Sequence, residues 1–161
     1  MKIKRKIILL LAILLPLIAL DRWTKVQAMA HLRGQDALSF WGGFFTLTYH
    51  ENSGAMLSLG NQLPDALRFF IFTGAVGIAL LAGIIYLLVK PIEKINYILG
   101  LIVIAGGLGN LYDRAFYDGK VVDFMLVSIG ALHTGVFNIA DVAIMIGFFG
   151  LIIHSFTANN K

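Results

Sequence analysis

The sequence contains no cysteine among its 161 residues. This absence excludes disulfide bonds, thiolate-bound metal centres and a cysteine nucleophile from the structure and chemistry of the protein. It does not fix the compartment, because membrane proteins without disulfides occur on both sides of a bilayer. Stability and function must therefore rest on apolar packing, hydrogen bonds and ion pairs.

Charged residues are also scarce. They make up 14% of the sequence, whereas apolar residues make up 58%. Typical soluble domains contain about 25% charged and about 45–50% apolar residues. A soluble domain of this length could not bury so much apolar surface, so the composition predicts an integral membrane protein.

The sequence also lacks the features of metal and nucleic-acid sites. It has no His-Glu-x-x-His motif, and its histidines are scattered, at His31, His50, His133 and His154. The net charge of +4 comes from basic residues that flank apolar runs, as in Lys2–Lys6 and Lys90–Lys94, and not from a basic face with interleaved aromatics. We therefore predict no metal, no other cofactor and no nucleic-acid partner.

Four apolar stretches approach the length of about 20 residues that a helix needs to cross a bilayer. They cover about residues 7–28, 66–89, 95–111 and 136–156. A cleaved secretory signal is the alternative for the first stretch, but the run continues into Asp21, Arg22 and Lys25 without a clear small-x-small cleavage site. We expect an all-α membrane protein with four transmembrane helices, forming a single domain over residues 1–161.

The basic residues predict how these helices are oriented. Short loops rich in lysine and arginine stay in the cytoplasm, which applies to Lys2–Lys6 and Lys90–Lys94. Both termini are then cytoplasmic, and about residues 29–65 and 112–135 lie outside. Phe40–Tyr49 is rich in residues that favour strands, so we expect a small extracytoplasmic β-sheet, with a loop or helix from the second outer segment lying over the active site.

Two acidic residues lie in apolar surroundings near the outer ends of the spans. Asp123 follows two valines, and Asp141 begins the fourth apolar stretch. Ionisable residues at membrane depth are costly and are functional candidates. Two carboxylates in one site cannot both ionise easily, so they can divide into the acid and the base that peptide hydrolysis needs. Serine chemistry has less support, since Ser53 follows Asn52 where a rhomboid-type peptidase has Gly-x-Ser.

Other polar residues recur at spacings that allow either structural or functional roles. Asp21 and Lys25 stand four residues apart and could form only an interfacial ion pair. The Asn52-Ser53-Gly54-Ala55 segment predicts a turn, and it could also hold a substrate carbonyl. Asp113, beside Arg114, could be a solvated helix end. These alternatives stay open on the residues alone.

Five motif blocks in this order resemble those of the lipoprotein signal peptidase (signal peptidase II) family. They are Asp21-x-x-Thr24-Lys25, Asn52-x-Gly54-Ala55, Gly106-Gly107-x-Gly109-Asn110-x-x-Asp113-Arg114, Val121-Val122-Asp123-Phe124 and Phe137-Asn138-x-Ala140-Asp141. The resemblance implies two catalytic aspartates, Asp123 and Asp141. It implies binding or supporting roles for eight further residues, Asp21, Lys25, Asn52, Gly54, Asn110, Arg114, Asn138 and Ala140. Asp113 also matches, and we interpret it as structural.

The resemblance also implies the substrate and the location. The family removes the signal peptide from bacterial prolipoproteins, just before a cysteine that carries diacylglycerol, at the outer face of the cytoplasmic membrane. It implies membrane lipids and a cyclic-peptide inhibitor of the globomycin type as ligands, and a monomer. Met56 and Leu57 depart from the Ala-Phe that commonly follows this Asn-x-Gly-Ala motif. The alternatives are a small transporter that uses the aspartates to handle ions and a structural adaptor, which would not need paired aspartates.

Overall fold

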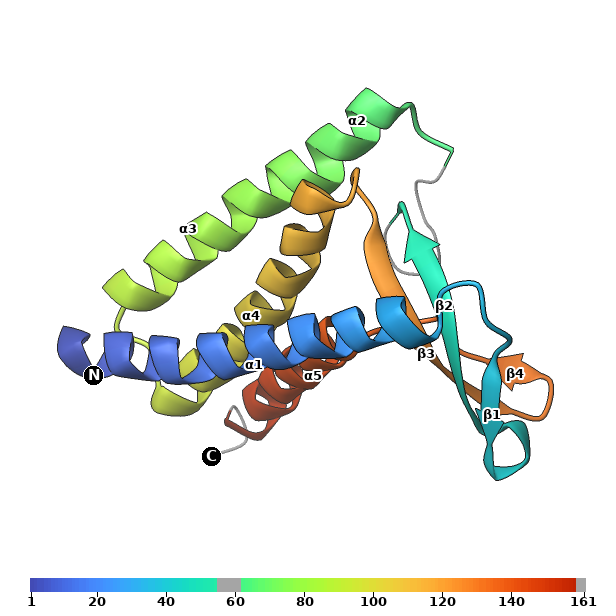
Figure 1. The fold of residues 1–161 in the computed structure, drawn as a ribbon. Helices are drawn as coiled ribbons and strands as arrows, with labels where there is room; N and C mark the ends of the chain where they lie inside the picture. The colour runs from blue at the N-terminus through green and yellow to red at the C-terminus, as the bar shows by residue number, and fades with distance from the viewer. Residues whose placement is uncertain (55–61, 159–161) are drawn as a thin grey trace.

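The computed structural model describes residues 1–54 and 62–158, and it is mostly helical with one small antiparallel sheet. Figure 1 shows long helices that occupy one side of the molecule and a sheet that lies at their far end, away from both termini. Three of the positions discussed above, Ala55, Met56 and Leu57, lie outside the described residues.

The chain begins with α1 (Ile3–His31), a helix of 29 residues that contains Pro16. Much of its first half exposes apolar side chains, including Ile8 at 57% and Leu15 at 62%. Its second half buries Asp21 and Lys25 instead. In Figure 1, α1 runs the length of the molecule, and its last turns reach the sheet.

The other helices are α2 (Asp65–Phe69), the π-helical η3 (Phe70–Ala75), α3 (Val76–Val89), α4 (Lys94–Phe116) and α5 (Ile139–Ala158). Among the described residues, three helical runs are long and apolar enough to cross a membrane, namely 65–89, 94–116 and 139–158. They correspond to the second, third and fourth predicted spans. The first predicted span lies within α1, which is not one of these three runs.

Helix α4 continues beyond the predicted end of its apolar stretch at residue 111. It ends at Phe116, so Asn110, Asp113 and Arg114 all lie on a continuous helix. The last turns persist because their polar side chains have partners in the protein, with Asp113 fully buried against α1 and the sheet. The alternative that Asp113 is a solvated helix end is therefore wrong.

The sheet contains four strands in the order β1-β2-β3-β4, and all neighbours are antiparallel. The strands are β1 (Leu38–Phe40), β2 (Phe45–Asn52), β3 (Val121–Ile129) and β4 (Leu132–His133), and the 3-10 turn η1 (Trp41–Gly43) joins the first two. The expected sheet in the first outer segment is confirmed. The second outer segment, expected as a loop or helix, supplies β3 and β4, because its run of β-branched and apolar residues pairs with β2.

Two apolar clusters form the core, one among the helices and one between α1 and the sheet. The first packs Leu14 of α1 and Leu87 of α3 against buried α4 residues, and the second packs the end of α1 against Val122 and Phe124 of β3. Helices α4 and α5 approach closely at Gly106, where an added Cβ would lie 2.3 Å from the Ala140 carbonyl oxygen. Gly109 is similarly confined, at 2.7 Å from an Asp21 carboxylate oxygen. These glycines allow the polar ends of α1, α4 and α5 to meet.

Lys6 connects α1 to the end of α3, at the end of the helices that is opposite to the sheet. Its side chain is buried, and its Nζ donates to the carbonyl oxygens of Leu87 (2.7 Å), Leu88 (2.9 Å) and Lys90 (2.5 Å) at the end of α3. The Tyr97 hydroxyl of α4 donates to the Lys6 carbonyl oxygen at 2.8 Å. A helix leaves its last carbonyls without intrahelical partners, and a cation satisfies them well. Lys6 therefore caps α3 as well as contributing to the basic flank.

Candidate active site

Asp123 lies on β3, where the sheet meets the helices. Its side chain is 1% exposed. Leu47 pairs with Met125 and His50 pairs with Asp123, so β2 carries one extra residue between these two pairs. A one-residue shift exchanges the two faces of a strand. The bulge thereby brings Asn52 to the face of Asp123, and its Nδ2 donates to Asp123 Oδ2 at 3.1 Å.

Asp141 lies in the first turn of α5, and Asn138 directly precedes that helix. The Asp141 N–H donates to Asn138 Oδ1 at 2.9 Å, while the Asn138 N–H donates to Asp141 Oδ2 at 3.1 Å. This reciprocal pair has the geometry of a capping box, and a carboxylate at a helix N-terminus is favoured by the helix dipole. The start of α5 thus fixes the Asp141 carboxylate in position.

The Asn138 side chain links the two aspartates. Its Nδ2 donates to Asp123 Oδ1 at 2.6 Å, while its Oδ1 accepts from the Asp141 backbone. The same Nδ2 also approaches the Val122 carbonyl oxygen at 3.3 Å and Asn110 Oδ1 at 3.1 Å. One buried amide therefore orders strand β3, helix α4 and helix α5 around a pair of carboxylates.

The environment of Asp123 favours its protonated form. Burial raises the pKa of this carboxyl from 3.8 to about 7, and the negative charge of Asp141 adds to the rise. Hydrogen bonds from Asn52 and Asn138 and the charge of Lys25 act in the opposite direction. The negative charge of Asp141 therefore raises the pKa of Asp123, as expected for two neighbouring carboxylates, but burial raises it more.

A buried ionic network lies behind Asp141. Lys25 Nζ donates to Asn110 Oδ1 at 2.9 Å and forms ion pairs with Asp21 (2.9 Å) and Asp113 (3.0 Å). The Asn110 Nδ2 then donates to Asp141 Oδ1 at 2.8 Å. The Asp21–Lys25 pair is therefore not an interfacial pair that only ends a helix, because its cation connects to the aspartates through Asn110.

Arg114 connects α4 to the turn after β2. Its guanidinium donates to the Gly54 carbonyl oxygen at 2.8 Å, and the Gly54 N–H donates to Asn52 Oδ1 at 3.0 Å. The guanidinium also lies 5.8 Å from the centre of the Phe72 ring in η3. The predicted turn at residues 52–54 thus holds the amide that contacts Asp123, with its backbone anchored to α4.

Ala140 and Asp21 complete the set of predicted residues. The Ala140 N–H donates to Asp21 Oδ1 at 2.9 Å, which joins α1 to the first turn of α5. A continuous chain of hydrogen bonds and ion pairs therefore contains all ten residues predicted for the site, Asp21, Lys25, Asn52, Gly54, Asn110, Arg114, Asp123, Asn138, Ala140 and Asp141.

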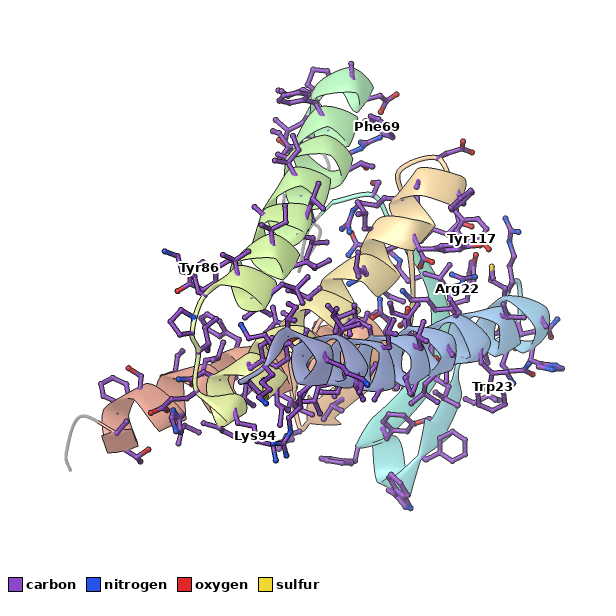
Figure 2. All side chains as sticks on the ribbon, turned by 90° about the vertical axis from the view of Figure 1, so that its left-hand side faces the viewer. Arg22, Trp23, Phe69, Tyr86, Lys94 and Tyr117 are labelled. Atoms are coloured by element: carbon purple, nitrogen blue, oxygen red, sulfur yellow. The ribbon has the colours of Figure 1, made fainter. Side chains whose placement is uncertain are left out.

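Sequence reasoning missed Arg22 as a member of this network. Its guanidinium pairs with Asp113, donates to the Tyr117 hydroxyl at 3.0 Å and lies 4.7 Å from the centre of the Tyr112 ring. Figure 2 shows Arg22 turned toward Tyr117, with Trp23 on the other side of α1. An arginine beside Asp21 near the end of an apolar helix was a sign of a buried ion pair. Its partner, Asp113, lies 91 positions away in the sequence, so no local pattern identified it.

The network contains four acidic residues, Asp21, Asp113, Asp123 and Asp141, and three side-chain amides, those of Asn52, Asn110 and Asn138. Among the described residues, no three histidine or acidic side chains are placed to hold a metal ion together. The arrangement favours a proton on Asp123 and orients both carboxyl groups by N–H donors. Such a site can activate water and polarise a carbonyl group.

The chain is similar to known proteins over most of its length. A family model described as signal peptidase (SPase) II matches residues 13–157. The chain is 41% identical over 156 residues to the lipoprotein signal peptidase of Francisella tularensis subsp. mediasiatica (strain FSC147), covering 94% of this chain and 92% of that protein. It is 37% identical over 153 residues to the lipoprotein signal peptidase of Syntrophus aciditrophicus (strain SB), covering 93% of each. A solved bacterial membrane enzyme has a TM-score of 0.75 at 26% identity, covering 98% of this chain and 92% of that one.

Proposed function

The chain belongs to the signal peptidase II family, and from that premise we propose that it removes the signal peptide from bacterial prolipoproteins with Asp123 and Asp141 as its catalytic pair. The observation that carries the proposal is the Asn138 amide, which links a carboxyl group on β3 to one at the N-terminus of α5. A transporter with ion-handling aspartates has no support among the relatives.

The two carboxyl groups divide the work of hydrolysis. Asp123, in its protonated form, donates its proton to the oxygen of the scissile carbonyl. Asp141, ionised, takes a proton from a water molecule whose oxygen attacks the carbonyl carbon. When the intermediate collapses, its hydroxyl proton returns to Asp123, Asp141 protonates the leaving nitrogen, and the carbon–nitrogen bond breaks. Both carboxyl groups regain their starting states, as general acid–base catalysis requires.

The position of the site fits a substrate anchored in the membrane. We propose that α1 crosses the bacterial cytoplasmic membrane as a fourth span, because its exposed first half is apolar. The basic flanks then place both termini in the cytoplasm and the aspartates near the outer face. There the scissile bond, just before a cysteine carrying diacylglycerol, reaches the site while the acyl chains stay among membrane lipids. The enzyme acts as a monomer, and a cyclic peptide of the globomycin type would occupy the same site.

A gel-shift assay on a diacylated precursor tests this function. Asp123→Asn and Asp141→Asn should each abolish cleavage while leaving folding intact, because asparagine keeps the shape of aspartate but cannot ionise. The double variant should be about as inactive as either single variant, since each loss removes the same shared proton. Asp118→Asn, at an exposed position, is the matched control. Near-normal turnover of Asp123→Asn would show that another carboxylate partners Asp141.

A further inference from the structure

Lys25 is completely buried, and its ammonium contacts three acceptors. These are oxygens of Asp21, Asp113 and Asn110, at 2.9–3.0 Å. An ammonium group can donate hydrogen bonds but cannot accept them. Asn110 must therefore present its oxygen to Lys25, and this requirement fixes which end of the amide faces Asp141.

The opposite orientation of Asn110 would be costly. Its Oδ1 also accepts from Asn138 Nδ2 at 3.1 Å, so a flipped amide would point its own NH₂ at two donors. The flip would also turn the Asn110 oxygen toward the Asp141 carboxylate, which now accepts from Nδ2 at 2.8 Å. A buried donor or carboxylate without a partner is strongly unfavourable.

We propose that Lys25 is a positioning residue that, through Asn110, holds Asp141 as the ionised member of the catalytic pair. The inference rests on the proposed function of Asp123 and Asp141. Asp141 then receives one N–H bond from Asn110 and one from the Asn138 backbone, and together they fix the orientation of its carboxylate. Lys25 itself acts on the substrate only through these groups.

The charged groups around Asp141 come from four elements. They are Asp141 itself on α5, Asp123 on β3, Asp113 and Arg114 on α4, and Asp21, Arg22 and Lys25 on α1. Removing Lys25 alone would leave Asp21 without its cation inside the protein, and such variants often fail to fold. The double variant Lys25→Met/Asp21→Asn removes one charge of each sign, and Asp113 keeps its pairing with Arg22.

The test measures kcat and KM of this double variant against pH on a diacylated precursor. Turnover should fall about tenfold to a hundredfold, as the loss of a hydrogen bond to a charged group predicts, with little change in KM. A fall in kcat with an unchanged KM separates a role in positioning the catalytic carboxylate from a loss of substrate binding. The same substitution at Lys120, which is 45% exposed and pairs with Glu51, should leave kcat and KM unchanged.

A folded double variant with normal kcat would overturn the proposal. If the double variant does not fold, Asn110→Asp carries the test, because its carboxylate can still accept from Lys25 but cannot donate to Asp141. Its kcat should also fall with little change in KM, and a normal kcat in the folded variant would overturn the proposal. Activity of Asp123→Asn or Asp141→Asn would instead refute the catalytic pair, so the two failures are distinguishable.

Discussion

The pH dependence of catalysis should report the Asp123 carboxyl group directly. The proposed mechanism needs this group protonated, and its pKa is raised to about 7 by burial and by Asp141. The alkaline limb of kcat should therefore fall through about pH 7. Replacing Asn52 by alanine removes a donor at 3.1 Å that favours the ionised form of Asp123. The pKa of Asp123 should rise further, and the alkaline limb should move to higher pH.

The size of the shift follows from the hydrogen bond that is lost. A hydrogen bond to a charged group contributes about 1.5–3 kcal/mol, and one pKa unit corresponds to about 1.4 kcal/mol. The pKa of Asp123 should rise by about one unit, near the lower end of this range, because the shorter side chain admits water that stabilises the ionised carboxylate. Turnover at the optimum should also fall in part, since Asn52 helps to order the turn at Gly54.

The assay is single-turnover cleavage of a diacylated precursor from about pH 5 to about pH 9, the range in which both limbs of such a profile appear. Gln35→Ala, which removes an amide from an exposed position, is the control and should leave both limbs in place. An alkaline limb that stays unmoved, or moves to lower pH in Asn52→Ala, would show that Asp123 is not the group whose proton catalysis needs.

Three further predictions concern stability, substrate and topology. The free energy of unfolding should fall by about 4 kcal/mol between about pH 4 and about pH 7, because the folded-state pKa of Asp123 exceeds 3.8; denaturation of Asp123→Asn in detergent should lack this slope. An unlipidated precursor should not be cleaved, and equal cleavage of both precursors in the gel-shift assay would contradict the family expectation. Reporter fusions should report cytoplasm after Lys90 and the outer side near Gly34 and Asp118, and an outward Lys90 would reverse the orientation.

The set of residues that form the site could be predicted from the sequence better than the secondary structure that positions them. Asp123 and Asp141 stood out because each lies in apolar surroundings, and the resemblance added their supporting residues. The strand that carries Asp123 was not expected, since a run of apolar residues outside a span has no clear periodicity when both of its faces are buried. The bulge in β2 depends on pairing with residues more than 70 positions away, which no local pattern records.

The start of α5 is the part of the site that the local sequence pattern could have predicted more fully. Asn138 followed three residues later by Asp141 is a helix N-terminus signature, and the structure shows the two residues bonded reciprocally there. The end of α4 was different. Its charged residues suggested that the helix stops near residue 111, but Asp113 continues it by pairing with Arg22 and Lys25. The end of α4 depends on partners on another helix. A prediction from composition alone therefore ends this helix too early in the sequence.

The Lys6 cap constrains the order in which the chain can be assembled during synthesis. Lys6 is among the first residues to leave the ribosome, whereas its carbonyl acceptors at Leu87, Leu88 and Lys90 are made more than 80 residues later. Contacts of such separation form only after the intervening chain is in place. The Lys6 ammonium therefore cannot make these hydrogen bonds until the end of α3 has been synthesised. When these hydrogen bonds form, α1 and α3 become joined at this end of the protein.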